Sequence, residues 1–115
     1  MSNNYEANKF LMKVGVSPDL CGYHYLAEAI NATKERLMNN DVNSKFMELY
    51  TDIANKFDTN YVRVERNMRH AIEKAFLSNN AVLQDMFGAL IDESGRVTVS
   101  CFVYAIAEHL IMENN

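Results

Sequence analysis

Three arginines recur at every third position of one short segment, at Arg63, Arg66 and Arg69. Their guanidinium groups can donate two parallel hydrogen bonds to the paired acceptors on the edge of a guanine base. Two neighbours are also of types that recognise bases: an asparagine such as Asn67 pairs with adenine, and a glutamate such as Glu65 accepts from the amino group of cytosine. These side chains therefore predict a surface that reads the edges of DNA bases.

A helix over residues 60–76 would gather these side chains on one side. At about 100° per residue, the apolar side chains of this segment fall on one arc and the polar ones on the opposite arc. The apolar arc holds Val64, Met68, Ala71, Ile72 and Ala75, and the polar arc holds Arg63, Arg66, Asn67, His70 and Lys74, flanked by Glu65 and Arg69. The sequence therefore predicts an amphipathic helix with its basic side outward.

A simpler interpretation of the same charges remains open. Surface helices normally carry charged residues on the solvated side, and Arg69 lies four residues from both Glu65 and Glu73. Such pairs stabilise a helix by only about 0.2–0.5 kcal/mol each. The charge pattern alone therefore does not separate a DNA-reading helix from an ordinary surface helix.

The segment before this helix has the pattern of a helix-turn-helix. Apolar residues predict a helix over 45–57, and Thr59 or Asn60 can cap the next helix, so the connection is three or four residues long. The first helix of such a pair usually crosses the phosphate backbone. We therefore place the motif at 45–76 and add Lys56 and Thr59 to the expected DNA-binding residues.

The remaining elements are also expected to be helical. Four glycines and one proline in 115 residues interrupt regular structure little. Helices are predicted over 5–14, 18–38, 81–90 and 98–112, with Gly15 ending the first, Ser17 and Pro18 starting the second, Ser44 capping the third and Thr98 capping the last. Gly22 is a possible irregularity, and a minor strand within 96–104 stays open. The expected fold is an all-α, compact six-helix domain, a single domain over 1–115.

The last predicted helix is apolar around most of its circumference, at Phe102, Val103, Tyr104 and Ile111. A helix of this kind is usually buried on most sides. Two explanations stay open, a self-association surface and a central core helix.

Overall charge limits the kind of partner. The net charge is −4, which argues against a general polyanion binder, since non-specific affinity for nucleic acid comes from Lys and Arg on phosphates. Residues 55–76 differ, because they hold five of the eleven basic side chains. The imbalance favours one local basic surface.

The sequence gives little support for catalysis, metal binding or membrane insertion. A phosphate-binding glycine loop and any defensible Ser/His/Asp or Cys/His grouping are missing, so we expect no enzymatic activity and no cofactor. Cys21 and His24 have the spacing of half a zinc site, but His70, Cys101 and His109 are isolated, so no metal is expected and the cysteines are interpreted as small packing residues. No apolar run approaches the roughly 20 residues that span a bilayer, and the cysteine spacing suits a reducing cytoplasm.

Four stretches carry a family resemblance: "GVSPDLCGYHYLAEAI" (15–30), "LYTDIANKFDTNYVRVERNMRHAIEKAF" (49–76), "MFG" (86–88) and "VTVSCFVYAIAEHL" (97–110). Together they resemble the C-terminal DNA-binding effector domain of the sporulation-initiation response regulator, the stage 0 sporulation protein A family. The resemblance implies a helix-turn-helix that reads a short box in the major groove of double-stranded DNA, dimers on tandem boxes, and contact with a sigma factor of RNA polymerase. It implies DNA-reading roles for Arg63, Glu65, Arg66, Arg69 and His70.

Two departures from that family qualify the expectation. The usual member has a receiver domain before the effector domain, whereas this chain has none, so it is expected to be a free-standing effector or an excised fragment. The end of the chain, "HLIMENN", is also less basic than is usual in the family. The alternative function is therefore a helical interaction module that does not bind DNA and pairs with a full-length relative or with RNA polymerase.

Overall fold

The computed structural model describes residues 4–41, 44–91 and 96–113, and within these ranges it contains six α-helices and no strand. In chain order the elements are α1 (Tyr5–Lys13), α2 (Cys21–Met38), α3 (Phe46–Lys56), α4 (Tyr61–Phe76), α5 (Ala81–Phe87), the short 3₁₀ turn η1 (Gly88–Leu90) and α6 (Val99–Glu113). The predicted all-α, six-helix class is confirmed. The minor strand that remained open within 96–104 is excluded, because α6 begins at Val99.

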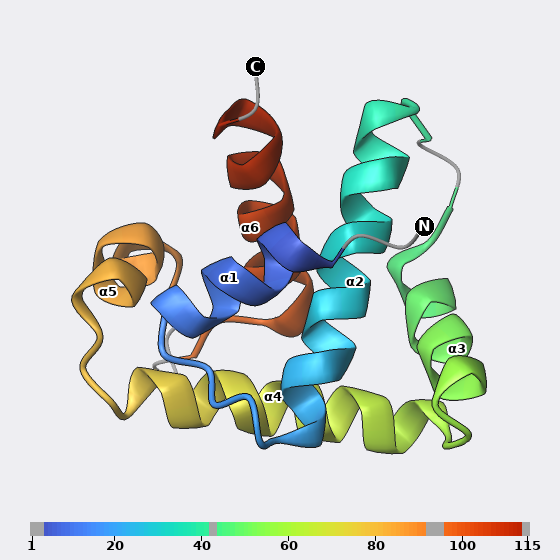
Figure 1. The fold of residues 1–115 in the computed structure, drawn as a ribbon, viewed down its shortest axis with the longest axis horizontal. Coiled ribbons are helices and arrows are strands. Elements are labelled where there is room, and N and C mark those ends of the chain that lie inside the picture. Colours follow the sequence, from blue (N-terminus) through green and yellow to red (C-terminus); the bar gives the residue numbers. More distant parts are fainter. Residues whose placement is uncertain (1–3, 42–43, 92–95, 114–115) are drawn as a thin grey trace.

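Helix α2 is the central element. It packs against α1, α3, α4 and α6, and Figure 1 shows α2 and α6 standing over α4, which runs across one end of the molecule. The fully buried side chains of Leu26 and Ile30 on α2, Met68 on α4, and Phe102 and Ile106 on α6 form the centre of the core. This packing fixes one side of α4 and leaves its other side on the surface.

The apolar character of α6 is explained by its place in this core. Phe102 and Val103 are completely buried, and the half-buried ring of Tyr104 lies 5.7 Å from the ring of Phe46 on α3. Ile111 is also half-buried. The core-helix explanation therefore accounts for Phe102 and Val103 without a second copy of the chain.

Helix α5 is short, and aromatic packing attaches it to the rest. Phe87 is fully buried and stacks on Phe102 of α6 with 4.9 Å between ring centroids. Asn80 fixes the other end of α5, because its side chain accepts from the N–H of Leu83 and donates to the carbonyl of Lys13. One residue thus joins the start of α5 to the end of α1.

Several predicted helix ends are confirmed. Of the two candidate caps of α4, Thr59 and Asn60, it is Asn60 that accepts from the N–H of Arg63 at 3.0 Å. Thr98 caps α6 by accepting from the N–H of Cys101 at 3.2 Å. Gly15 follows α1 with φ +88°, a left-handed conformation that glycine adopts without strain.

Two predicted starts are wrong. Helix α2 begins at Cys21 rather than at Pro18, because the backbone of Leu20 is extended (φ −90°, ψ 140°). The hydroxyl of Ser17 donates to the carboxylate of Asp19. Ser44 does not cap α3 either. Its N–H and hydroxyl both donate to Asp41.

Lys45 holds the capping position of α3 instead. Its backbone N–H donates to the carboxylate of Glu48 at 3.0 Å, which supplies one half of a capping box. In both segments the backbone leaves the extended conformation later than the serine, at Leu20 and at Lys45, and residue type alone does not show where that happens.

Candidate nucleic-acid interface

The predicted helix-turn-helix is present as α3, residues 57–60 and α4. Backbone hydrogen bonds close the turn, from Phe57 N to Ile53 O at 3.0 Å and from Thr59 N to Ala54 O at 2.9 Å. Asp58 between them has φ +55°, a left-handed conformation that aspartate tolerates better than most residues. The short turn makes α3 cross one end of α4, as Figure 1 shows.

Buried side chains hold the two helices at this crossing. Helix α3 packs against both α4 and α2, and its buried side chains are Leu49, Tyr50, Ile53 and Ala54. The ring of Phe57 stands edge-on to Tyr25 of α2 at 5.1 Å. The position of α4 is therefore set by α2 and α3 together.

Helix α4 has the two sides that its periodicity predicts. Its buried residues are Val64, Met68, Ala71, Ile72 and Ala75. Its exposed residues include Arg63, Arg66, Arg69, His70 and Lys74, while Glu65 and Asn67 are half-buried at the two edges of the polar side. The structure thus brings all the expected α4 site residues onto one side of the helix.

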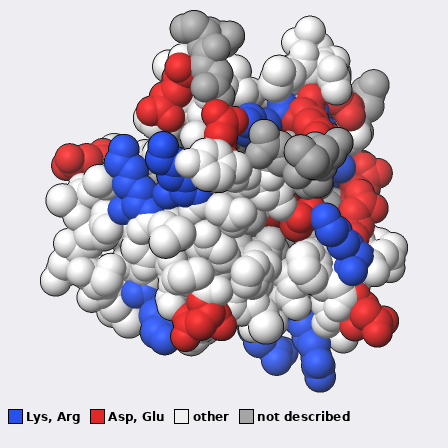
Figure 2. All heavy atoms as spheres, viewed as in Figure 1, with Lys and Arg blue, Asp and Glu red and all other residues white. Residues whose placement is uncertain are grey.

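Two of the three arginines lie free of acidic groups within the described part of the chain. Neither Arg63 nor Arg66 has an ion pair there, and a 100° advance per residue places Arg66 opposite the buried Ala75. Figure 2 shows basic side chains projecting from the lower edge of the molecule, where α4 runs in the same view. These guanidinium groups point away from the interior.

Arg69 differs from the other two arginines. Its Nη1 lies 2.9 Å from both carboxylate oxygens of Glu65, the four-residue pair that the simpler interpretation predicts. Glu73, also on α4, pairs instead with Arg96: a carboxylate oxygen of Glu73 lies 3.5 Å from Nε of Arg96, which precedes α6 in the chain. Arg69 stays 47% exposed, so this surface pair screens its charge without burying it.

The two expected residues outside α4 lie beside it. Lys56, at the end of α3, forms an ion pair with Glu28 of α2 at 2.8 Å, although the lysine side chain remains 52% exposed. Thr59 is half-buried in the turn. Lys56 is thus part of the helix-turn-helix, but a carboxylate already offsets part of its charge.

Gly22 has a role that the sequence did not reveal. It does not interrupt α2, and a Cβ built at this position would lie 2.1 Å from the backbone oxygen of Asn67 and 2.9 Å from Cβ of Ala71. The glycine therefore lets the first turn of α2 rest directly on the backbone of α4. A glycine inside an otherwise regular helical pattern was the available signal.

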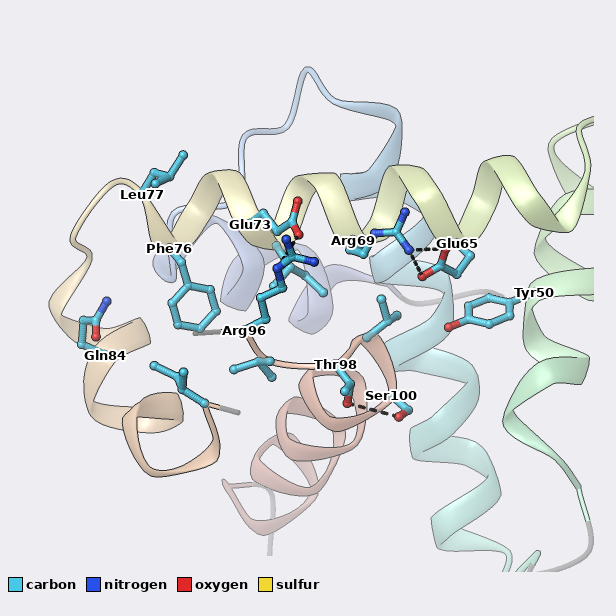
Figure 3. Close-up of a pocket in the computed structure, with 14 residues that line it drawn as sticks. Tyr50, Glu65, Arg69, Glu73, Phe76, Leu77, Gln84, Arg96, Thr98 and Ser100 are labelled. Carbon is cyan, nitrogen blue, oxygen red and sulfur yellow. Dashed lines mark hydrogen bonds and ion pairs between the residues drawn. The ribbon is translucent and has the colours of Figure 1, made fainter. Parts of the chain in front are cut away.

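A groove runs along the edge of α4 that carries Glu65, Arg69 and Glu73. It has a volume of about 690 Å³, and Ile72, Phe76 and residues 96–100 also line it. Figure 3 shows Arg69 turned toward Glu65 and Arg96 toward Glu73 along one side, with Tyr50 at one end. Burial, and next the charge of Glu65, raise the pKa of Tyr50 to about 12.

The cysteines and histidines do not gather. Within the described ranges, no three side chains of His, Cys, Asp or Glu come close enough to hold a metal ion. Cys101 is half-buried against the core, whereas Cys21 is exposed at the start of α2, so its interpretation as a packing residue is wrong. No helix in the described part of the chain is both long enough and apolar enough to cross a membrane.

Two helices joined by a closed four-residue turn, with the second helix buried on one side and basic on the other, define a helix-turn-helix protein of the nucleic-acid-binding class. The family model described as "Sporulation initiation factor Spo0A C terminal" matches residues 7–110. The chain therefore belongs to this family of DNA-binding effector domains, which regulate transcription in sporulation. The resemblance drawn from the sequence is confirmed.

Proposed function

We propose that this protein is a sequence-specific transcription regulator that reads a short box in the major groove of double-stranded DNA with α4. The observation that carries the proposal is that Arg63 and Arg66 project from the second helix of a helix-turn-helix, with no ion pair in the described part of the chain. The residues of this helix that face outward are those that reach base edges.

Each polar residue of α4 has a role in this proposal. Arg63 and Arg66 donate paired hydrogen bonds to guanine, and Asn67 and Glu65 recognise adenine and cytosine from the edges of the helix. Arg69 reaches the DNA by releasing its ion pair with Glu65 and binding a base or a phosphate instead. His70 lies next to Arg69 on the helix. These residues supply the sequence preference.

Phosphate contacts position the helix and come from its surroundings. Lys56 and Thr59, at the turn, are the proposed contacts, and they add affinity for all sequences alike. The proposal includes a homodimer on tandem boxes, contact with a sigma factor of RNA polymerase, and a cytoplasmic location. It includes no catalytic step and no cofactor.

A fluorescence-anisotropy titration at low salt tests the proposal. The probes are a duplex with two tandem boxes of the family type and a scrambled duplex of the same composition. Arg66→Ala is expected to cost about 1–3 kcal/mol on the box and to relax the preference at one base pair, because a paired base contact is lost. Arg66→Lys keeps the charge but lacks the fork, so it should also lose preference.

Lys56→Ala provides the contrasting result. It should weaken binding to both duplexes about equally and lower the salt slope by about one. The control is Lys9→Ala, at an exposed lysine of α1, which should change neither. Unchanged box preference in Arg66→Ala would remove that residue from base reading. No saturable binding by the wild type, together with a co-purifying protein partner, would favour the helical interaction module instead.

A further inference from the structure

The first turn of α4 carries an apolar side chain on its outward side. Val62 is 48% exposed and is not one of the buried residues that form the hydrophobic core. It lies one turn before Arg66, so the two side chains are neighbours on the same strip of the helix. Arg63 follows it directly in the chain and is also exposed.

Exposure alone gives Val62 no function, because single apolar residues are common on protein surfaces. Leu77 and Met12 are even more exposed, at 83% and 60%. Leu77 lies just beyond the last residue of α4, and Met12 lies on α1. Val62 differs because it lies beside Arg63 and Arg66 in the first turn of α4. The first turn is the part of a recognition helix that comes closest to the bases.

We infer that Val62 is a specificity-determining residue that contacts the C5-methyl group of a thymine next to the base pair read by Arg66. The inference rests on the proposed function and names part of the sequence that the site selects. Thymine is the only base that presents a methyl group in the major groove. The side chain of valine has no hydrogen-bonding group. If it faced a polar base edge, it would displace water from that edge without replacing the lost hydrogen bond.

The size of the effect follows from the area of one methyl group. Burying one methyl group away from water contributes about 0.8 kcal/mol to binding, which corresponds to about a fourfold change in affinity. That change is small beside the loss of a paired arginine contact. A measurement that isolates the methyl groups is therefore required.

A double-substitution cycle between protein and DNA provides this measurement. Each thymine of the box is replaced in turn by 2′-deoxyuridine, which keeps the base pair and removes only the C5-methyl group. The duplexes are titrated with the wild-type chain and with Val62→Ala. We expect one replacement to weaken wild-type binding about fourfold and to leave Val62→Ala binding unchanged.

Leu77→Ala serves as the matched control. It also shortens an exposed apolar side chain, at the far end of α4, and it should respond to every deoxyuridine as the wild type does. Thermal unfolding of each variant checks that the fold is kept.

The outcomes separate this inference from the proposed function. Equal deoxyuridine responses in the wild type and Val62→Ala, on a box that the wild type still prefers over the scrambled duplex, would overturn the role of Val62 and leave the function standing. Absence of any preference for the box would overturn both.

Discussion

Replacing Gly22 by alanine tests how α2 supports the recognition helix. The added Cβ would lie 2.1 Å from the backbone oxygen of Asn67, far inside van der Waals contact, and a backbone atom cannot turn away as a flexible side chain can. Helix α2 or α4 must therefore move. Overpacking of this kind typically costs about 1–3 kcal/mol, and the better helix propensity of alanine, up to about 1 kcal/mol, offsets part of that cost.

We expect Gly22→Ala to lower the free energy of unfolding by about 1–2 kcal/mol in urea titrations followed by circular dichroism. Because the clash falls on the backbone of α4 beneath its polar side, binding to the box should weaken as well, at a temperature where the variant is still folded. A variant that loses stability but binds the box with unchanged affinity would show that α2 does not set the position of α4.

Gly88→Ala is the matched control for the same chemical change. Gly88 has helical backbone angles and nothing within 4 Å of an added Cβ. Alanine there should stabilise the protein by about 0.4–1 kcal/mol, because it restricts the unfolded chain. The packing argument is refuted if Gly22→Ala is as stable as Gly88→Ala.

Three further predictions concern single side chains. The hydroxyl of Thr33 on α2 is fully buried and has no hydrogen-bond partner in the described part of the chain. Thr33→Val should therefore raise the free energy of unfolding by about 1 kcal/mol in urea titrations. A loss of stability would instead show that the hydroxyl has a partner. Asn60→Ala removes the cap of α4 and should cost about 1 kcal/mol by the same method, whereas Asn60→Asp should keep most of it. The folded state raises the pKa of Tyr50 from 10.0 to about 12, so the stability that its neutral phenol contributes is complete below pH 10 and is lost as the pH rises through about 12. Tyr50→Phe should therefore make the free energy of unfolding depend less on pH across this range. An unchanged pH dependence would contradict the prediction.

The local helical pattern was largely predictable from the sequence. The apolar repeat of α4 runs through sixteen residues without a proline or glycine, so both its helical state and its two sides follow from the side chains alone. Thr98, and Asn60 as one of two candidates beside Thr59, were recognisable as caps because their short polar side chains reach backbone N–H groups three residues ahead. Ser17 and Ser44 were misread as caps because the last extended residue before each helix is Leu20 or Lys45; each serine hydroxyl instead donates a hydrogen bond to a nearby aspartate.

The pairing of side chains between helices was decided by the tertiary structure. Nothing in the sequence says that Lys56 meets Glu28, or that Glu73 meets Arg96, because these partners come from segments far apart in the chain. Glu65 had two possible functions, and only the coordinates place both of its oxygens on Arg69.

The sequence by itself determined where the six helices lie, apart from their exact ends, and which side of α4 is polar, because both depend on spacing along a single segment. Only the tertiary structure decided that Gly22 lies against the backbone of Asn67 and that α6 is a central core helix. It also decided that, within the described residues, Arg63 and Arg66 form no ion pair whereas Arg69 forms one with Glu65. The physical reason is that periodicity fixes directions around one helix axis. The neighbours met in each direction depend on how separate helices pack together.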